Sequence, residues 1–106
     1  MTDKIVVLST ASSAEEAEKI ARGLVEARLA ACVNVVPGMR SFYRWKGTIE
    51  DATEWLLVIK SSRGRFEALL AALEKLHSYE VPEVIALSVV DGAKNYLNWV
   101  DSELHA

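Results

Sequence analysis

The fold is decided by the stretch Ser41-Phe42-Tyr43-Arg44-Trp45-Lys46-Gly47-Thr48-Ile49-Glu50, which predicts a β-hairpin. Aromatic and β-branched residues occupy both arms, and Gly47 can adopt the positive φ that a tight turn needs. The second arm leads into residues 55–59, which are apolar at every position and predict a strand without a polar face. Polar-aromatic residues at the tip of a hairpin that is rooted in such a strand favour a role in assembly.

On the N-terminal side of the hairpin, the hydrophobic pattern predicts a strand, a helix and a second strand. The strands are expected over residues 4–10 and 30–36, and Pro37-Gly38 is a turn signal that would close the second one. The helix between them begins at Ser12 or Ser13, because each serine is followed three residues later by a glutamate. The pattern does not distinguish the two starts.

On the C-terminal side the pattern again predicts a strand, a helix and a strand. Ser61-Ser62 is expected to open a second helix that ends near His77, and residues 84–90 supply the last strand. Asp91-Gly92 is expected to cap a C-terminal helix. Residues 1–106 therefore predict one α+β domain, a ferredoxin-like sandwich (βαββαβ) with a long β-hairpin and a C-terminal helix.

The strands of this sandwich are more apolar than one covered face requires. Two helices would cover one face of the sheet, so each strand should alternate apolar and polar residues. Residues 5–8, 56–59 and 84–87 are instead apolar on both faces. A sheet face of that kind, left in water, would exceed the apolar patches usual on monomers. The sequence therefore predicts a homo-oligomer.

Composition places the chain among ordinary soluble proteins. The formal net charge of −3 gives no reason to expect nucleic acid or an anionic membrane as a partner. No apolar run approaches the ~20 residues that span a bilayer, and residues 1–4 do not resemble a secretory signal. The single cysteine, Cys32, cannot form an intrachain disulfide. The expected location is the cytoplasm.

Few residues offer metal or catalytic chemistry. Cys32, expected in mid-strand, is most simply a small buried hydrophobe, since no CxxC or HxxH spacing accompanies it. His77 most simply stabilises the end of the second helix, although copper could be held weakly or across subunits. No G-x-S-x-G or phosphate-binding glycine motif is present, so an enzyme is not expected. One further group of polar-aromatic residues suits an interface or a small-molecule cleft: Tyr43, Trp45, Lys60, Tyr79, Glu83, Tyr96 and Trp99.

Several blocks of the chain, in order and over nearly its whole length, resemble the divalent-cation tolerance proteins (CutA). The blocks are residues 26–34 (EARLAACVN), 43–47 (YRWKG) with Ile49-Glu50, 57–61 (LVIKS), 77–83 (HSYEVPE) and 96–100 (YLNWV). The resemblance implies a ferredoxin-like fold and a homotrimer whose hairpins reach across subunits. It also implies copper or other divalent-ion binding without an established enzymatic activity. The polar-aromatic residues are expected around the inter-subunit cleft.

The copper ligands proposed for that family transfer poorly to this chain. The family pattern has a cysteine near the end of the first strand and a His-His pair after the second helix. The corresponding residues here are Ser9, Leu76 and His77, so only His77 remains as a metal ligand. Any copper-like divalent ion is therefore expected to bind weakly.

Two other functions compete with the tolerance protein. One is a signalling module similar to the PII proteins, with a small anion or nucleotide in the inter-subunit cleft, but the glycine-rich loop is missing. The other is an acylphosphatase-type enzyme on the same fold, which would need a glycine-bounded loop with an arginine after the first strand. Residues 9–12 (STAS) offer no such loop.

Overall fold

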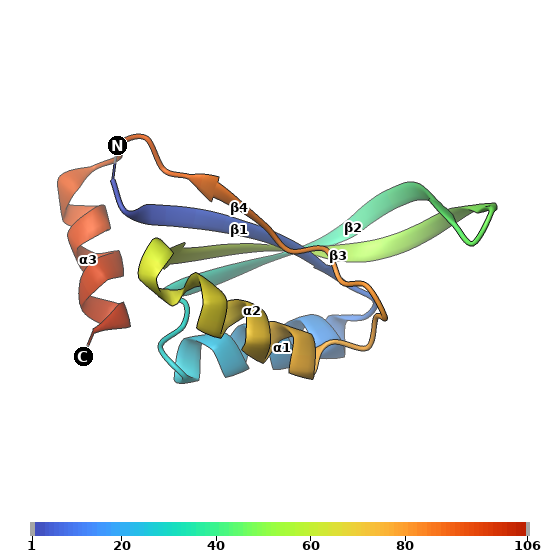
Figure 1. Cartoon of the computed structure of the whole chain (residues 1–106), viewed down its shortest axis with the longest axis horizontal. Helices are drawn as coiled ribbons and strands as arrows, with labels where there is room; N and C mark the ends of the chain where they lie inside the picture. The colour runs from blue at the N-terminus through green and yellow to red at the C-terminus, as the bar shows by residue number, and fades with distance from the viewer. Residues whose placement is uncertain (1, 106) are drawn as a thin grey trace.

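The computed structural model describes residues 2–105 and confirms the α+β class (Figure 1). Within those residues, four strands form one antiparallel sheet in the order β2-β3-β1-β4. The strands are β1 (Lys4–Ala11), β2 (Cys32–Trp45), β3 (Thr48–Ser62) and β4 (Ile85–Ser88). The helices are α1 (Ala14–Glu26), α2 (Phe66–Leu76) and α3 (Lys94–Leu104), with a 3₁₀ turn at Arg63–Arg65.

Helices α1 and α2 lie on the same face of the sheet, and the core lies between the helices and that face (Figure 1). Alternate residues of β1 and β3 point into this core, as the period of two in a strand requires. The largest of its side chains are at most 4% exposed: Ile5, Val7, Ile20, Leu24, Leu57, Ile59, Leu69 and Leu73. Helix α3 lies apart, across one end of the sheet, where Val100 and Leu104 pack with Ala31.

The start of α1 is decided by Ser13. Its hydroxyl accepts a hydrogen bond from the Glu16 backbone N–H at 3.1 Å, which makes Ser13 the N-cap. The Glu16 carboxylate accepts from the backbone N–H of Ser12 at 3.0 Å and, across the molecule, from the backbone N–H of Ser78 at 2.8 Å. Glu16 therefore joins the start of α1 to the segment that follows α2.

The predicted hairpin is confirmed, and it is longer than expected. Lys46 and Gly47 have φ of 50° and 82°, the two positive values of the tight turn. The principal extents are 44 × 25 × 23 Å, and the Cα radius of gyration is 14.3 Å. A compact chain of this length would have a radius of about 13 Å, so the hairpin projects beyond the body of the molecule (Figure 1).

The prediction that Pro37-Gly38 closes a strand is wrong. Strand β2 continues through both residues to the hairpin turn, and its pairing register with β3 shifts between Val36 and Met39. Pro37 and Gly38 together oppose Trp55, so β2 carries one extra residue here, a bulge, and Gly38 has a positive φ of 76°. A proline is tolerated there because β2 is an edge strand of the sheet.

Two predicted helix starts are also wrong. Ser61-Ser62 belongs to the end of β3, and the Ser61 hydroxyl donates to the backbone carbonyl of Leu29 at 2.7 Å instead of capping a helix. At α3 the N-cap is Ala93, and the Asp91 carboxylate accepts from the N–H of the neighbouring Gly92 at 2.8 Å instead of capping the helix. The last strand is shorter than its apolar run, since β4 pairs only over Ile85–Ser88.

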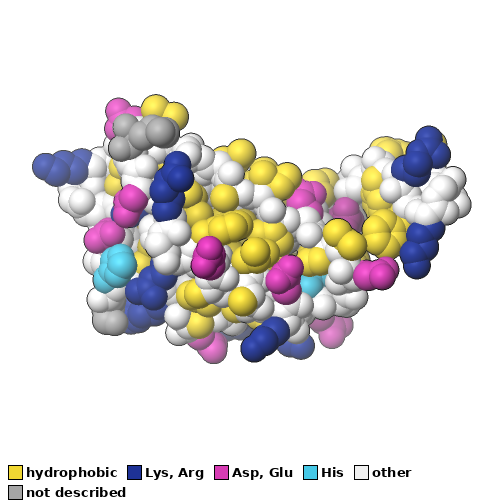
Figure 2. All heavy atoms as spheres, in the orientation of Figure 1, with side chains coloured by type: hydrophobic (Ala, Val, Ile, Leu, Met, Phe, Trp, Pro, Cys, Tyr) yellow, Lys and Arg dark blue, Asp and Glu magenta, His cyan; other side chains and the backbone are white. Residues whose placement is uncertain are grey.

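The sheet face opposite α1 and α2 is apolar and largely uncovered, and we call it the open face. Residues that are directly paired in an antiparallel sheet point to the same side, so the register defines the face. Its apolar members are Val6, Leu8, Val36, Leu56, Val58, Ile85 and Leu87. Val36, Ile85 and Leu87 are 44–49% exposed. Figure 2 shows hydrophobic side chains gathered over the middle of the molecule and at the hairpin.

Among residues 2–105, no helix has the length and apolar character that crossing a membrane would require.

Candidate functional site

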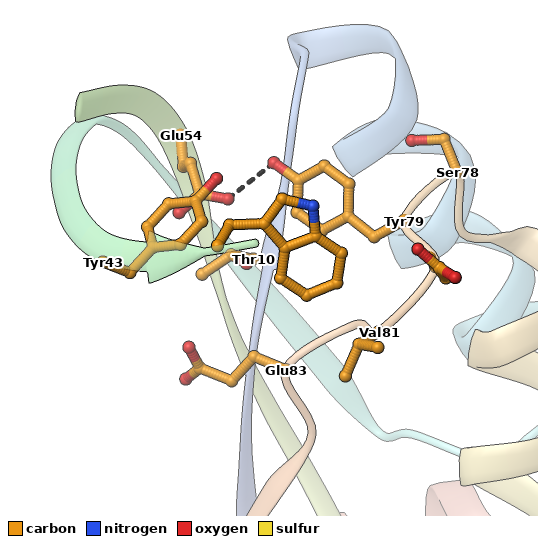
Figure 3. Close-up of a pocket in the computed structure, with 9 residues that line it drawn as sticks. Thr10, Tyr43, Glu54, Ser78, Tyr79, Val81 and Glu83 are labelled. Carbon is orange, nitrogen blue, oxygen red and sulfur yellow. Dashed lines mark hydrogen bonds between the residues drawn. The ribbon is translucent and has the colours of Figure 1, made fainter. Parts of the chain in front are cut away.

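A pocket of about 400 Å³ lies where the hairpin leaves the sheet (Figure 3). The hairpin supplies Tyr43 and Trp45 from β2 and Glu54 from β3, and β1 supplies Thr10. The irregular segment between α2 and β4 supplies the other side. The complete lining is Thr10, Tyr43, Trp45, Glu54, Ser78, Tyr79, Glu80, Val81 and Glu83.

A buried carboxylate and a phenol meet in this pocket. Glu54 is only 5% exposed, and its Oε2 atom accepts a hydrogen bond from the Tyr79 hydroxyl at 2.6 Å (Figure 3). Burial and the adjacent Glu54 carboxylate raise the pKa of the Tyr79 phenol above its ordinary value of 10.0. Tyr79 therefore remains a proton donor throughout the physiological pH range.

The charge of the pocket is negative. Three carboxylates line it, those of Glu54, Glu80 and Glu83, and no lysine, arginine or histidine does. The only ion pair that these three form with described residues joins exposed Glu80 to Lys46 at 3.9 Å. The electrostatic character of the site therefore favours cations over anions.

The structure brings together some members of the polar-aromatic set and separates others. Tyr43, Trp45, Tyr79 and Glu83 share the pocket. Lys60, Tyr96 and Trp99 do not line it. Lys60 donates to the Asn34 side chain near the start of β2, and the rings of Tyr96 and Trp99 lie 5.7 Å apart on α3.

Sequence reasoning missed Glu54, although a signal was present. Glu54 shares the open face with Leu56 and Val58, because alternate residues of a strand point to the same side. A carboxylate in line with apolar residues on one strand face needs a partner, since an isolated buried charge is costly. The apolar run that begins at the next residue, Trp55, predicts a buried strand and gives no sign that Glu54 belongs to the same buried face.

His77 lies in a hydrogen-bonded position after α2. Its Nε2 atom donates to the backbone carbonyl of Thr10 at 2.6 Å, and its Nδ1 atom accepts from the Tyr79 backbone N–H at 3.1 Å. These partners require the neutral tautomer with the proton on Nε2. A metal ion can bind this imidazole only by displacing one of the two hydrogen bonds.

The other positions of the expected copper pattern do not complete a metal site. The Ser9 hydroxyl is fully buried and has no hydrogen-bond partner among the described residues. Leu76 packs against α1 at Gly23. Within residues 2–105, no three His, Cys, Asp or Glu side chains are grouped so that they could hold a metal ion. The residues of one protomer do not fit a closed copper site.

Cys32 differs from its predicted setting. It is the first residue of β2 rather than a mid-strand residue, and it is only partly buried. Its Sγ atom lies 3.8 Å from the Lys60 ammonium group. The sulfur therefore sits at the end of the sheet near α3, far along the strands from the pocket at the hairpin base.

Comparison with known proteins gives one consistent result. The sequence model of the family described as CutA1 divalent ion tolerance protein matches residues 5–103. The divalent-cation tolerance protein CutA of Thermus thermophilus is 47% identical over 95 residues, which are 90% of this chain and 92% of the relative. The protein of that name from Pectobacterium atrosepticum is 40% identical over 104 residues, 98% of this chain and 94% of the relative. The crystal structure of CutA from Xylella fastidiosa superimposes with a TM-score of 0.95 at 42% identity, over 97% of this chain and 99% of that one.

Proposed function

Because the chain belongs to the CutA1 divalent ion tolerance family, we propose that it is a non-enzymatic, homotrimeric divalent-cation tolerance protein. Its role is in the response to metal ions, and it binds copper-like divalent ions weakly. The observation that carries the assembly is the open face, where a single protomer leaves apolar side chains of all four strands partly or fully exposed.

The open face supports assembly on energetic grounds. Burial of apolar surface contributes roughly 25 cal/mol per Å², so a sheet face covered by another subunit stabilises the association considerably. The projecting hairpin adds Phe42 and Ile49, which are 64% and 65% exposed in one protomer. Exposure of this kind on both a sheet and a hairpin fits an arrangement in which each subunit packs against two others.

The separation of the polar-aromatic residues fits the same arrangement. In one protomer Tyr43, Trp45, Tyr79 and Glu83 lie at the hairpin base, whereas Lys60, Tyr96 and Trp99 lie towards α3. A shared cleft containing all seven residues forms when the first group of one subunit meets the second group of its neighbour. This cleft between subunits is the place where a small-molecule or anion ligand would contact Lys60.

Light scattering coupled to gel filtration tests the assembly. The expected molar mass is three times the 11.7 kDa of the chain, and it should persist on dilution to low micromolar concentration. A monodisperse particle of about 12 kDa would overturn the proposal.

Calorimetric titration with Cu²⁺ tests the metal function. The expected affinity is weak, because His77 must give up a hydrogen bond and only one imidazole is available. His77→Ala should reduce the binding further, and His105→Ala, which removes the other histidine, should not. Tight binding that is unchanged in His77→Ala would show that other residues hold the ion.

The remaining expectations have separate tests. We propose a cytoplasmic location, which fractionation of cells expressing the chain would check. The relatives compared above are named tolerance proteins and not enzymes. The PII-like signalling alternative is not favoured by these comparisons. A thermal-shift panel of nucleotides would reveal a ligand of that kind as a rise in apparent stability.

A further inference from the structure

Strand β3 carries two opposite charges on the open face, one at the hairpin base and the other towards α3. Glu54, Leu56, Val58 and Lys60 are alternate residues of β3 and therefore point to the same side. Lys60 follows Glu54 by six residues, which is about 20 Å along an extended strand. At that separation the two charges of one subunit do not form an ion pair, and physiological salt screens them, because the Debye length is about 8 Å.

The Glu54 carboxylate has no cation of its own subunit beside it. Glu54 is 5% exposed and accepts a hydrogen bond from the Tyr79 hydroxyl at 2.6 Å. Among residues 2–105, no lysine, arginine or histidine nitrogen lies within 4.0 Å of this carboxylate. One hydrogen bond from a neutral phenol offsets only part of the cost of removing a charge from water, so Glu54 needs a positive partner from outside the subunit.

The Lys60 ammonium group has the complementary need. Within its own subunit it donates to the Asn34 side chain and lies 3.8 Å from the Cys32 sulfur, and neither partner is a carboxylate. No described carboxylate lies within 4.0 Å of it. An ammonium has three donors, so at least one N–H remains for a further acceptor. Lys60 is only half-buried in one protomer, so a second copy of the chain can reach it.

We propose that Lys60 of each subunit is the counter-ion of Glu54 in the next subunit. This inference rests on the proposed trimer and adds the contact that orients the subunits. In a closed ring of three, the hairpin-base end of each open face meets the α3 end of the next one, so every buried acid receives a base. The negative pocket at the hairpin base is then a docking site for a second copy of this chain.

The aromatic residues of the cleft surround this ion pair. Tyr43 and Trp45 line the pocket of one subunit, and Tyr96 and Trp99 of the next subunit arrive with α3, which packs across the Lys60 end of the sheet (Figure 1). All four rings are 38–44% exposed in one protomer and therefore have surface left to bury. Rings that exclude water strengthen the attraction between the two charges. An anionic ligand in this cleft would have to compete with Glu54 for the ammonium group.

A double-mutant cycle tests whether the two charges meet. Lys60→Met removes the ammonium, and Glu54→Gln removes the negative charge but keeps an acceptor for Tyr79. The thermal midpoints of the four full-length proteins are compared at one chain concentration, because the midpoint of an oligomer depends on it. Lys60→Met should lower the midpoint by several degrees, since it leaves a buried carboxylate unpaired. Adding Glu54→Gln should raise the midpoint of the Lys60→Met protein again.

The outcomes of this cycle separate the ion pair from the trimer itself. Residues about 20 Å apart in one subunit should have additive effects, so recovery in the double variant shows a contact across subunits. If light scattering finds the unaltered chain to be a monomer, both the trimer and the ion pair are overturned. If the chain is a trimer and the two effects simply add, only the ion pair is overturned. Coupling of Lys60 to the exposed Glu83 in a parallel cycle with Glu83→Gln, and not to Glu54, would mean that the wrong carboxylate was assigned.

Substitutions at Lys60 alone remain decisive if Glu54→Gln does not fold. A carboxylate across the interface predicts midpoints that fall in the order Lys60→Arg, Lys60→Met, Lys60→Glu. A role confined to the hydrogen bond with Asn34 would leave Lys60→Met and Lys60→Glu alike, and that result would contradict the proposal. Lys75→Met is the matched control, because Lys75 is exposed on α2, on the opposite side of the sheet. It should leave the midpoint unchanged.

Discussion

The imidazole of His77 joins the end of β1 to Tyr79, in the irregular segment between α2 and β4 that lines the pocket. Its Nε2 atom donates to the Thr10 carbonyl at 2.6 Å, while its Nδ1 atom accepts from the Tyr79 backbone N–H, and the His77 and Tyr79 rings lie 4.6 Å apart. His77→Ala leaves both backbone groups without these partners. We expect it to lower the free energy of unfolding by about 1–3 kcal/mol, measured by urea denaturation.

His105→Ala is the matched control, because the His105 side chain is exposed and its ring lies 3.6 Å from the Asp101 carboxylate and 3.4 Å from the Arg65 guanidinium. It should change the free energy of unfolding by less than about 0.5 kcal/mol. If the two variants were equally stable, the hydrogen bonds of His77 would contribute nothing measurable.

The ionisation of Glu16 makes the free energy of unfolding depend on pH. Burial alone would raise its pKa, but hydrogen bonds from Ser12 and Ser78 outweigh that effect and lower the pKa from 4.5 to about 2. A lowered pKa in the folded state adds stability above pH 4.5, and this stability is lost as the pH falls towards 2. Glu16→Gln should therefore cost about 1 kcal/mol at pH 6, a value reduced by solvent screening, and progressively less in acid.

Urea denaturation between pH 6 and pH 2 checks this dependence. Glu15→Gln is the neighbouring control, since Glu15 is exposed in the same first turn of α1. The difference between the Glu16→Gln variant and the unaltered chain should shrink below pH 4.5. A difference that stays constant down to pH 2 would mean that the charge of Glu16 is not what stabilises the contact.

The sequence predicted the strands, the helices and the hairpin because each has a local signal. Residues 41–50 carry the turn chemistry, and the buried stripes of α1 and α2 follow the helical period. The wrong predictions concern residues whose partners are distant in the sequence. Ser61 resembles a helix cap, but its hydroxyl is taken by the Leu29 carbonyl, 32 residues away.

In the candidate site, too, the sequence alone did not reveal contacts between residues that are distant along the chain. Of the seven residues predicted around a cleft between subunits, Tyr43, Trp45, Tyr79 and Glu83 line one pocket of a single protomer, whereas Lys60, Tyr96 and Trp99 do not. Glu54 was missed, since its role depends on burial against Tyr79 from a segment 25 residues further on.

Gly23 allows α1 and α2 to approach closely. A Cβ atom at this position would lie 3.0 Å from the Leu76 Cδ1 atom. Alanine would otherwise stabilise the helix interior by about 1 kcal/mol relative to glycine. We expect Gly23→Ala to leave the free energy of unfolding within about 0.5 kcal/mol, because displacement of Leu76 offsets the helix gain.

A double-mutant cycle separates these two effects. In a Leu76→Ala background the contact is absent, so Gly23→Ala should stabilise the chain by about 1 kcal/mol. Urea denaturation of the four proteins gives the coupling energy. Equal effects of Gly23→Ala in both backgrounds would show that Leu76 does not restrict position 23.

The proposed trimer should be sensitive to a single charge on the open face. Leu87 pairs with Val6 on that face and is 48% exposed in one protomer. Leu87→Lys would bury an unpaired ammonium in the proposed interface, so we expect the molar mass by light scattering to fall to that of the monomer at low micromolar concentration. Val25→Lys is the matched control, since Val25 is 42% exposed on α1, away from the open face, and should leave the trimer intact. A trimer that persists in Leu87→Lys would place the interface elsewhere.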